Sequence, residues 1–330
     1  MKYAVLSKRK SGNDLKSIKY LGKFEVGGRN NGWEWNREGN EHKKYLPKVM
    51  SVWNTKKNIQ TPCQASYEKG NFQKIQTGMY MEIQKEECEY MIKEGKTLVF
   101  PYPWTKEHRP ESIQVYTDKK KHMSYIILNE GGHRMYFPRV FSKSEVRDYF
   151  NSILTEQDKR SPHYYFDSLD EKLRDSTFLD IGGAEGYITL TVLPYVREAV
   201  IFECDEKWAE ALTATFEPYR DKVRIVSKFA GRNDSGETVR IDSVVKGKNN
   251  VVLKIDVEGM EKEVLSGAEE TLNRSDTKVF VCAYHQKQDE EELGALLREH
   301  GFRTSTTDGW MYFGNEDASF RRGIVRAWKE

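Results

Sequence analysis

The sequence predicts an α/β protein in which residues 176–330 form a mostly parallel, doubly wound sheet with an antiparallel edge strand. Five short, nearly continuous apolar runs recur from residue 177 onward, which is typical of parallel strands that helices cover on both faces. Helical stretches separate several of these runs, and this alternation indicates a doubly wound sheet. Two further β-like runs follow the last helix, and we expect them to pair antiparallel at one edge. The chain before this sheet is expected to form an N-terminal α+β extension.

The elements of the sheet follow in order along the chain. The five expected parallel strands are 177–181, 199–204, 223–228, 251–257 and 278–285. The expected helices are 205–219, 258–272 and 289–301, and the edge strands are 302–307 and 323–329. In the last helix, Asp289 and Glu292 have the spacing of a capping box, and Gly301 stands where that helix would end.

The region before the sheet has a different character. Residues 1–60 contain 14 Lys or Arg against 5 Asp or Glu, and the Asn and Gly content of 30–40 indicates a loop. Segment 96–104 is expected to be a strand that ends at Pro101. Two β-rich runs on either side of 129–132 predict a hairpin. Ser142 or Ser144 can cap the helix that follows, whose apolar face contains Val146, Tyr149, Phe150 and Ile153.

The composition limits the class of protein. The formal net charge of +2 and a pI near 8.1 are too mild to indicate a nucleic-acid partner on their own. No apolar run is long enough to span a membrane, and the first ten residues are too polar for a signal peptide. The cysteines form no CxxC pair, so we expect reduced thiols in a cytoplasmic protein: Cys63, Cys88, Cys204 and Cys282.

A glycine-rich turn, "LDIGGAEGYITL" at 179–190, follows the first expected strand. In a doubly wound sheet, ligands lie beyond the carboxyl ends of the strands, where the strand order reverses. The turn does not fit GxGxxG in either register, and Asp180 and Glu185 would repel a pyrophosphate. Two carboxylates favour an ammonium or sulfonium group, and S-adenosylmethionine carries both. Glu203 follows the second strand, where an acidic residue can accept both ribose hydroxyls.

Four segments resemble the FkbM family of S-adenosylmethionine-dependent methyltransferases. They are "LDIGGAEGYITL", "VIFECD", "NNVVLKIDVEGMEKEVLSGAEETL" and "CAYHQKQDEEELGALLREHGF". The most specific piece is "KIDVEG" at 254–259, followed by Glu261 and by "LSGA" at 265–268. The resemblance covers roughly 120–328 and implies a Rossmann-like class I methyltransferase fold that methylates a hydroxyl, often on a sugar or polyketide-type product. The family commonly has "FEP" where this chain has "FECD", but Glu203 is kept.

We expect three parts of the chain, and the resemblance implies a set of donor-binding residues. Residues 1–120 have no assigned role, 121–175 would form a cap or a wall of the acceptor pocket, and 176–330 would bind S-adenosylmethionine. The methionine half would lie against Asp180, Gly182, Gly183, Ala184, Glu185, Gly186 and Tyr187. The ribose and adenine would lie against Glu203, Cys204, Asp205, Phe229 and Ala230, although Phe229 can equally be a core residue. Asp256 would stand at the pocket edge, and Glu258 would open the next helix, where the helix dipole favours a carboxylate even without a functional role.

Methyl transfer to a hydroxyl needs an acceptor oxygen held in line and a base for its proton. His285, at the end of the fifth strand, is the expected general base, and Asp256 would orient its imidazole or stabilise its charge. The alternative for His285 is a structural histidine at a strand end. A divalent metal with Asp256 as one ligand is possible but not favoured, because no second or third carboxylate can be assigned nearby from the sequence.

Aromatic and basic residues upstream of the sheet are expected to contact a small-molecule or glycan acceptor. Such residues suit a sugar ring, especially one that bears a phosphate or nucleotide. The expected set is Arg134, Tyr136, Arg139, His163, Tyr164, Tyr165 and Trp310. The alternative is that the tyrosines form the core of a small subdomain and that Trp310 is a half-exposed loop residue.

Three other functions compete with this interpretation. A nucleic-acid methyltransferase is disfavoured, because the fourth strand ends in "KIDVEG" rather than in an Asn/Asp-Pro-Pro-aromatic turn. A dehydrogenase is disfavoured by the carboxylates of the glycine turn. A non-catalytic protein that keeps the fold would bind S-adenosylmethionine without turnover.

Overall fold

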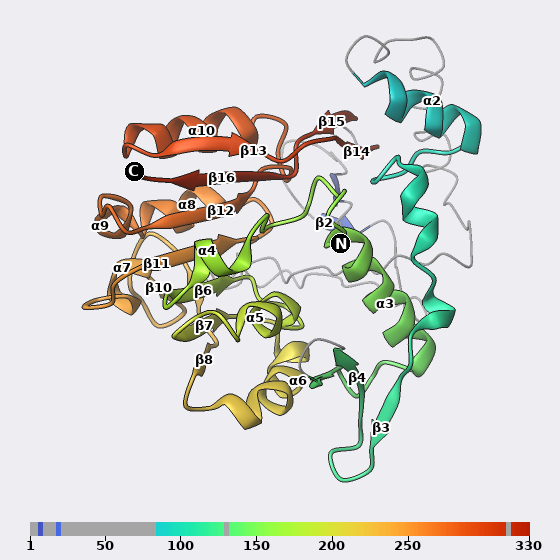
Figure 1. Cartoon of the computed structure of the whole chain (residues 1–330), viewed down its shortest axis with the longest axis horizontal. Coiled ribbons are helices and arrows are strands. Elements are labelled where there is room, and N and C mark those ends of the chain that lie inside the picture. The colour runs from blue at the N-terminus through green and yellow to red at the C-terminus, as the bar shows by residue number, and fades with distance from the viewer. Residues whose placement is uncertain (1–5, 9–17, 21–83, 129–131, 315–317) are drawn as a thin grey trace.

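A seven-stranded sheet forms the centre of the computed structural model, which describes residues 6–8, 18–20, 84–128, 132–314 and 318–330 (Figure 1). In spatial order its strands are β13 (Arg303–Thr306), β16 (Ile324–Trp328), β12 (Lys278–Cys282), β11 (Val251–Ile255), β6 (Thr177–Ile181), β7 (Glu198–Phe202) and β8 (Val223–Val226). All seven strands expected between residues 176 and 330 are therefore present, and several end earlier than predicted.

The order and direction of these strands define where a ligand can bind. The five strands from β8 to β12 pair in parallel, and β16 lies antiparallel between β12 and β13, which confirms the predicted antiparallel edge. The chain passes outward from β6 to β8 and then returns to β11 on the other side of β6. The strand order thus reverses between β6 and β11, and ligands of doubly wound sheets bind at this point.

Helices cover both faces of the sheet. Alternate residues of a strand therefore pack into two separate apolar clusters, one on each face. Phe178 and Ile201 pack with residues of α3 and α6 on one face, whereas Leu179 and Val200 pack with residues of α8, α9 and α10 on the other. The bounds are α3 (Lys143–Glu156), α5 (Tyr187–Val192), α6 (Glu206–Phe216), α7 (Ile241–Val244), α8 (Glu261–Ser266), α9 (Glu269–Leu272) and α10 (Asp289–Glu299). Burial on both faces explains why each central strand is apolar along its length.

A small antiparallel sheet and helix α3 precede the large sheet. The small sheet has the order β3 (Tyr116–Asp118), β4 (Met123–Leu128) and β5 (His133–Tyr136), and β4 and β5 form the predicted hairpin. Ser142 caps α3 by accepting from the Glu145 backbone, and the Glu145 side chain completes a capping box. The four apolar residues expected on one face of this helix are all buried, so the sequence located the helix and its orientation.

The remaining elements are short. They are β1 (Leu6–Lys8), β2 (Ile18–Tyr20), α2 (Lys85–Glu94), η2 (Pro103–Glu107), η3 (Pro110–Ser112), α4 (Leu169–Leu173), η4 (Glu217–Tyr219), β9 (Phe229–Ala230), β10 (Thr238–Val239), β14 (Met311–Phe313) and β15 (Ser319–Arg321). The loop expected at 30–40 lies outside the described residues. Within the part of the chain that the structure describes, no helix is both long and apolar enough to cross a membrane.

Three predictions about local structure are wrong. Segment 96–104 is not a strand: Pro101 and Pro103 lack an N–H for a ladder, and η2 begins at Pro103. Residues 258–272 do not form one helix, since α8 begins at Glu261 and its C-cap is Gly267. The capping box of Asp289 is absent, because Gln288 is the N-cap and provides no side-chain bond.

Candidate active site

The glycine turn after β6 packs between the ends of β7 and β11. The N–H groups of Gly182 and Gly183 both donate to the carbonyl of Phe202, each at 3.0 Å. Gly182 has a φ of +82°, and a Cβ at this position would lie 1.9 Å from the carbonyl oxygen of Asp256. Only glycine meets both conditions. The turn is therefore locked against the strand end that carries Asp256.

Asp180 lies beneath the turn and does not face a ligand, contrary to the prediction. Its side chain is fully buried, with Oδ1 2.9 Å from Lys254 Nζ, and its Oδ2 accepts from the Thr189 hydroxyl at 2.8 Å. Lys254 also donates to the carbonyl of Gly182 at 2.8 Å. Burial alone would lower the pKa of Lys254, but the Asp180 and Asp256 carboxylates hold it above its usual value. Lys254 and Asp180 therefore form a buried ion pair that supports the turn.

No role was predicted for Lys254, although its position in the sequence contained a signal. A lysine inside the apolar run 251–257 must be buried with that strand, and a buried charge needs a partner. An aspartate in the neighbouring strand was the obvious candidate, since Lys254 and Asp180 are paired in the register of β11 and β6.

Glu203 joins the glycine turn to the start of α6. Its carboxylate accepts from the Ala184 N–H and from the Asp205 N–H, each at 2.8 Å, and the residue is 2% exposed. Asp205 is the N-cap of α6, and Cys204 is a half-buried thiol. The carboxylate stands at the carboxyl end of β7, as predicted.

The residues expected near an adenine lie after the third strand. Phe229 is 37% exposed and is therefore not a core residue. Ala230 packs against the apolar cluster of the second sheet face. Phe229 and Ala230 form the short strand β9, which pairs with β10.

One pocket opens at the reversal point between β6 and β11. Its wall comes from α3, from the segment after it, from the glycine turn and from the ends of β11 and β12. The lining residues are Tyr149, Ile153, Glu156, Gln157, His163, Tyr165, Gly182, Gly183, Ala184, Glu185, Tyr187, Ile188, Lys254, Asp256, Glu258 and Tyr284. Glu185 faces this pocket and accepts from the Tyr149 hydroxyl at 2.8 Å, so the cap and the turn are joined there. Gly186 begins α5 from a φ of +83°.

Asp256 is the centre of a hydrogen-bond network in this pocket. The Tyr284 hydroxyl donates to its Oδ1 at 3.1 Å, and the Tyr165 hydroxyl donates to its Oδ2 at 3.3 Å. Burial would raise the pKa of Asp256, but the charges of Lys254 and His285 outweigh burial and hold it well below its usual range. Asp256 is thus a carboxylate at neutral pH, and it accepts hydrogen bonds without taking up a proton.

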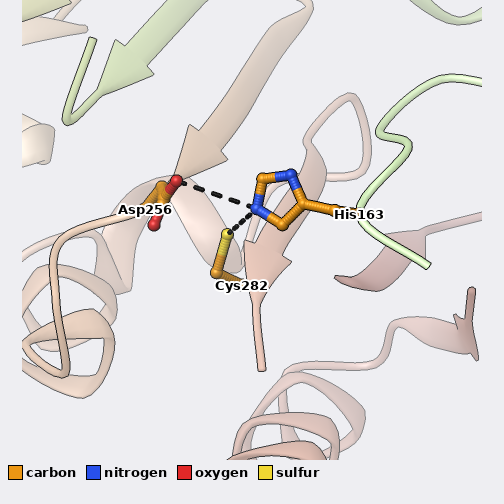
Figure 2. A group of neighbouring side chains, drawn as sticks. All are labelled: His163, Asp256 and Cys282. Carbon is orange, nitrogen blue, oxygen red and sulfur yellow. Dashed lines mark hydrogen bonds and ion pairs between the residues drawn. The ribbon is translucent and has the colours of Figure 1, made fainter. Parts of the chain in front are cut away.

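His163 reaches the same network from the other side (Figure 2). Its Nε2 lies 3.1 Å from the Tyr284 hydroxyl, 3.7 Å from Cys282 Sγ and 4.0 Å from Asp256 Oδ2. The Gln157 amide nitrogen lies 3.1 Å from the His163 carbonyl and 3.2 Å from Nδ1. Since a carbonyl only accepts, Gln157 donates, so Nδ1 accepts and the ring proton is on Nε2. Burial lowers the pKa of His163, in agreement with a neutral ring.

His285 lies beside Asp256, as predicted, but it is held by a residue that sequence analysis did not assign. Nε2 is 3.5 Å from Asp256 Oδ1 and 3.9 Å from Glu258 Oε2, while Nδ1 is 2.9 Å from Glu261 Oε1. Burial would lower the pKa of His285, but Glu261, then Asp256 and Glu258, raise it to about 9. The residue is not part of the pocket lining. Its ring is therefore an imidazolium at neutral pH, directly behind Asp256.

Glu261, rather than Glu258, opens the helix after the fourth strand of the chain's parallel set. Glu258 does not open a helix: it lies in the turn before α8 with a φ of +59°. Glu261 is the first residue of α8, is buried, and accepts from the N–H groups of Val257 and Gly259 at 3.0 and 3.3 Å. Its spacing of five residues from Asp256 was the available signal. The expectation that Asp256 has no further carboxylates nearby is therefore wrong.

Two groups of side chains in the described residues have the spacing of metal ligands: His163, Asp256 and Cys282, and Asp256, Glu261 and His285. The first group is tied by hydrogen bonds, since the Tyr165 hydroxyl contacts Cys282 Sγ at 3.0 Å, and burial raises the pKa of that thiol well above its usual value. The second group has carboxylate and imidazole donors, which suit Mg²⁺ or Mn²⁺. Glu261 already contacts Nδ1, which leaves Nε2 for a metal.

Of the seven residues expected to contact the acceptor, His163 and Tyr165 line the pocket, and the other five do not. Three are engaged elsewhere: the Tyr136 hydroxyl donates to Asp118, Arg134 lies over the Tyr125 ring, and Arg139 pairs with Glu210. Tyr164 and Trp310 also lie outside the lining, and the Trp310 ring is stacked beneath the Arg322 guanidinium. The expected arginine contacts to a phosphate are therefore absent from the described pocket.

The sheet order, the glycine turn after its central strand and the acidic residue after the neighbouring strand define the class I methyltransferase fold. Residues 203–304 match the family model described as Methyltransferase FkbM domain, which confirms the resemblance noted above. The match covers about a third of the chain and begins after the glycine turn, so it shows that this segment is similar to the FkbM methyltransferase domain. A match to this methyltransferase domain implies S-adenosylmethionine as the methyl donor.

Solved structures give only a distant likeness. A methyltransferase FkbM from Methylobacillus flagellatus KT is 16% identical, with a TM-score of 0.38 over 56% of this chain and 54% of that one. This chain thus matches about half the length of that protein. A precorrin-6y C5,15-methyltransferase from Geobacter metallireducens GS-15 is 15% identical, with a TM-score of 0.37 over 49% and 84% of the two chains. No curated protein matches the sequence.

Proposed function

We propose that this methyltransferase transfers a methyl group to a hydroxyl of a sugar, a glycan or a related natural product. The observation that supports this most is the shared pocket. The glycine turn of the donor site and the Asp256 network line the same cavity, so a donor on the turn would present its methyl group toward Asp256 and the two tyrosines. Such a site suits a reaction in which positioning supplies much of the rate.

The donor would lie along the carboxyl edge of β6 and β7. S-adenosylmethionine supplies a methyl group on a positively charged sulfonium. Gly182, Gly183, Ala184 and Tyr187 would contact its methionine half, and Glu185 would attract its ammonium group. The two Glu203 oxygens each accept one backbone N–H, and this carboxylate would also accept the ribose hydroxyls. Cys204, Asp205, Phe229 and Ala230 would flank the adenosine.

The proton of the acceptor hydroxyl needs a base, and the charges of the site indicate which group can take it. Asp256 stays ionised to low pH, so it orients and stabilises rather than receives the proton. His285 can accept a proton only when neutral, and its pKa of about 9 means that the neutral fraction grows as the pH rises toward 9. General-base help of this kind contributes about 10²–10⁴-fold. We therefore expect activity to increase from neutral pH to about pH 9.

A metal-assisted variant has specific support in the same residues. Nε2 of His285 lies 3.5 Å from Asp256 Oδ1 and 3.9 Å from Glu258 Oε2, and Glu261 Oε1 lies 2.9 Å from Nδ1 on the other side of the ring. A carboxylate behind a histidine in this way is the usual support of a metal ligand. Activity that EDTA abolishes and magnesium restores would assign the cluster to a metal. Activity that survives EDTA would indicate that the cluster instead takes up the proton of the acceptor hydroxyl.

A nucleic-acid acceptor is less well supported. Four carboxylates and a single lysine line the described pocket, and such a wall opposes a polyphosphate chain. A non-catalytic protein would bind the donor and methylate nothing.

Incubation with a methyl-labelled donor and a panel of hydroxylated acceptors tests the proposal. We expect label in a base-stable methyl ether. Label only in a nucleobase, or donor binding with no label in any acceptor, would contradict it.

A further inference from the structure

Tyr149 is a tyrosine of helix α3 whose hydroxyl reaches the glycine turn. It donates to Glu185 Oε2 at 2.8 Å, although the two residues lie 36 positions apart in the chain. Both residues line the pocket at the reversal point. The donor site proposed above uses Glu185 and gives no role to Tyr149, so the purpose of this contact between α3 and the turn is still to be explained.

The ring of Tyr149 is held in place by other aromatic rings. Its centroid lies 5.3 Å from that of Trp208 in α6 and 5.9 Å from that of Phe141, and the residue is 7% exposed. Burial, and then the charge of Glu185, raise the pKa of the Tyr149 hydroxyl well above its usual value. The hydroxyl therefore keeps its proton at neutral pH and donates from a fixed position.

The backbone on either side of Glu185 is also fixed. The Ala184 N–H donates to Glu203 at 2.8 Å, and a Cβ at Gly186 would lie 2.6 Å from the Phe216 ring of α6. A glutamate side chain nevertheless has several rotatable bonds, and ordering them costs conformational entropy. The hydrogen bond from Tyr149 restricts these bonds before a ligand arrives, so less of that cost remains when the ligand binds.

A buried carboxylate that receives an ammonium group needs support of this kind. Glu185 is 9% exposed. A buried ion pair is favourable only when its geometry is good and further hydrogen bonds satisfy the charged groups. Tyr149 supplies such a bond to Oε2. Because tyrosine is neutral, this bond leaves the negative charge of Glu185 in place, whereas a lysine or an arginine would cancel it.

From this arrangement we infer that Tyr149 is a positioning residue for the methyl donor, which holds the Glu185 carboxylate where the ammonium group of S-adenosylmethionine binds. The inference rests on the proposed function, because it takes the donor to lie on the glycine turn. It extends donor recognition to α3, a helix outside the sheet and outside the motifs that indicated the donor site.

The test compares two ligands that differ only in the ammonium group. The first is S-adenosylhomocysteine, and the second is its deamino analogue, in which a hydrogen atom replaces that group. Calorimetric titration at pH 7 should show that the unchanged protein binds the analogue about tenfold or more weakly than S-adenosylhomocysteine. Tyr149→Phe should weaken S-adenosylhomocysteine about tenfold and leave the analogue within about twofold, whereas a merely structural role would weaken both ligands equally.

A second background tests whether Tyr149 acts through Glu185. Glu185→Gln removes the charge but keeps the shape of the side chain, so it should abolish the preference for S-adenosylhomocysteine over the analogue. Adding Tyr149→Phe to Glu185→Gln should change the affinity for S-adenosylhomocysteine by less than about twofold, because no charged carboxylate is left to position. Circular dichroism checks that each variant is folded.

Tyr136→Phe is the matched control. Tyr136 is 4% exposed, and its hydroxyl donates to the Asp118 carboxylate at 2.9 Å, but it does not line the pocket. This substitution also removes a buried hydroxyl from a carboxylate, and it should leave the affinity for both ligands unchanged.

Each other outcome counts against the inference. Equal binding of the two ligands by the unchanged protein, unchanged S-adenosylhomocysteine affinity in Tyr149→Phe, or equal loss of both ligands in that variant would overturn it. The same loss in Tyr136→Phe, or a full tenfold effect of Tyr149→Phe in the Glu185→Gln background, would also overturn it. Failure of S-adenosylhomocysteine to bind the unchanged protein would contradict the proposed function itself, so the two failures are distinguishable.

Discussion

Replacing Glu261 with glutamine should lower the pKa of His285 and leave the surrounding loop intact. Glutamine keeps a carbonyl oxygen for the Val257 and Gly259 N–H groups but removes the negative charge 2.9 Å from Nδ1. Burial would lower the pKa of His285, but the charges of Glu261, Asp256 and Glu258 outweigh burial and raise it to about 9. Glu261 is the largest of these influences, so we expect the pKa to fall by about one unit or more.

The assay is a pH titration of the histidine ring by NMR, which needs no acceptor. Because the folded-state pKa of His285 is raised, its contribution to stability is complete below pH 6.5 and is lost as the pH rises through 9. The melting temperature of Glu261→Gln should therefore fall most, relative to the unchanged protein, near pH 6, and the difference should close above pH 9. Glu263→Gln, in the same helix but paired with Arg232, is the control. An unchanged titration of His285 in Glu261→Gln would refute the arrangement.

Three further predictions follow from the site. Glu203→Ala should weaken donor binding about tenfold or more, because two charge-assisted hydrogen bonds of about 1.5–3 kcal/mol each are lost. Calorimetry measures the donor affinity, and circular dichroism checks that the variant is folded. An unchanged dissociation constant would show that Glu203 does not hold the ribose. Gly182→Ala should lower the melting temperature and abolish donor binding, because its Cβ would lie 1.9 Å from the Asp256 carbonyl oxygen. Gly247→Ala is the control for backbone strain alone, because Gly247 has a φ of +74° and open space around it. Equal effects of the two substitutions would contradict this prediction. His285→Ala should lower turnover about 10²-fold with donor affinity nearly intact, and Asp256→Asn should also reduce turnover. Label transfer across pH 6–9 measures both. Unchanged turnover in His285→Ala would show that this histidine is structural.

The strands of the large sheet could be predicted because their physical signal is local. A strand buried on both faces needs apolar residues at every position, and 177–181 and 251–255 meet that need almost completely. The cap of α3 was also predictable, since Ser142 and Glu145 form a capping box within four residues. Asp289 had the same spacing but accepts from the Gln286 N–H instead, outside the helix. Spacing alone does not determine which residue becomes the N-cap.

The position of the site could be predicted from the sequence, but the ion pairs and protonation states within it could not. Glu203 and Asp256 lie at strand ends, as the order of elements required. The direction of the Asp180 side chain could not be predicted, because it depends on a lysine 74 residues away, Lys254, in the neighbouring strand. The pKa of His285 likewise depends on Glu261, which reaches it only because α8 begins later than the pattern indicated. Arg139 was expected at the acceptor, but Glu210 of α6 pairs with it away from the pocket.

Calorimetric titration with S-adenosylmethionine and with NAD tests the central claim most directly, since the donor site supports every other assignment. Glu185 faces the pocket, where its negative charge would repel a pyrophosphate, and Glu203 would accept hydrogen bonds from a ribose. We predict saturable binding of S-adenosylmethionine and of S-adenosylhomocysteine, and no binding of NAD. Binding of NAD more tightly than S-adenosylmethionine, or no binding of either methyl-donor form, would contradict the account.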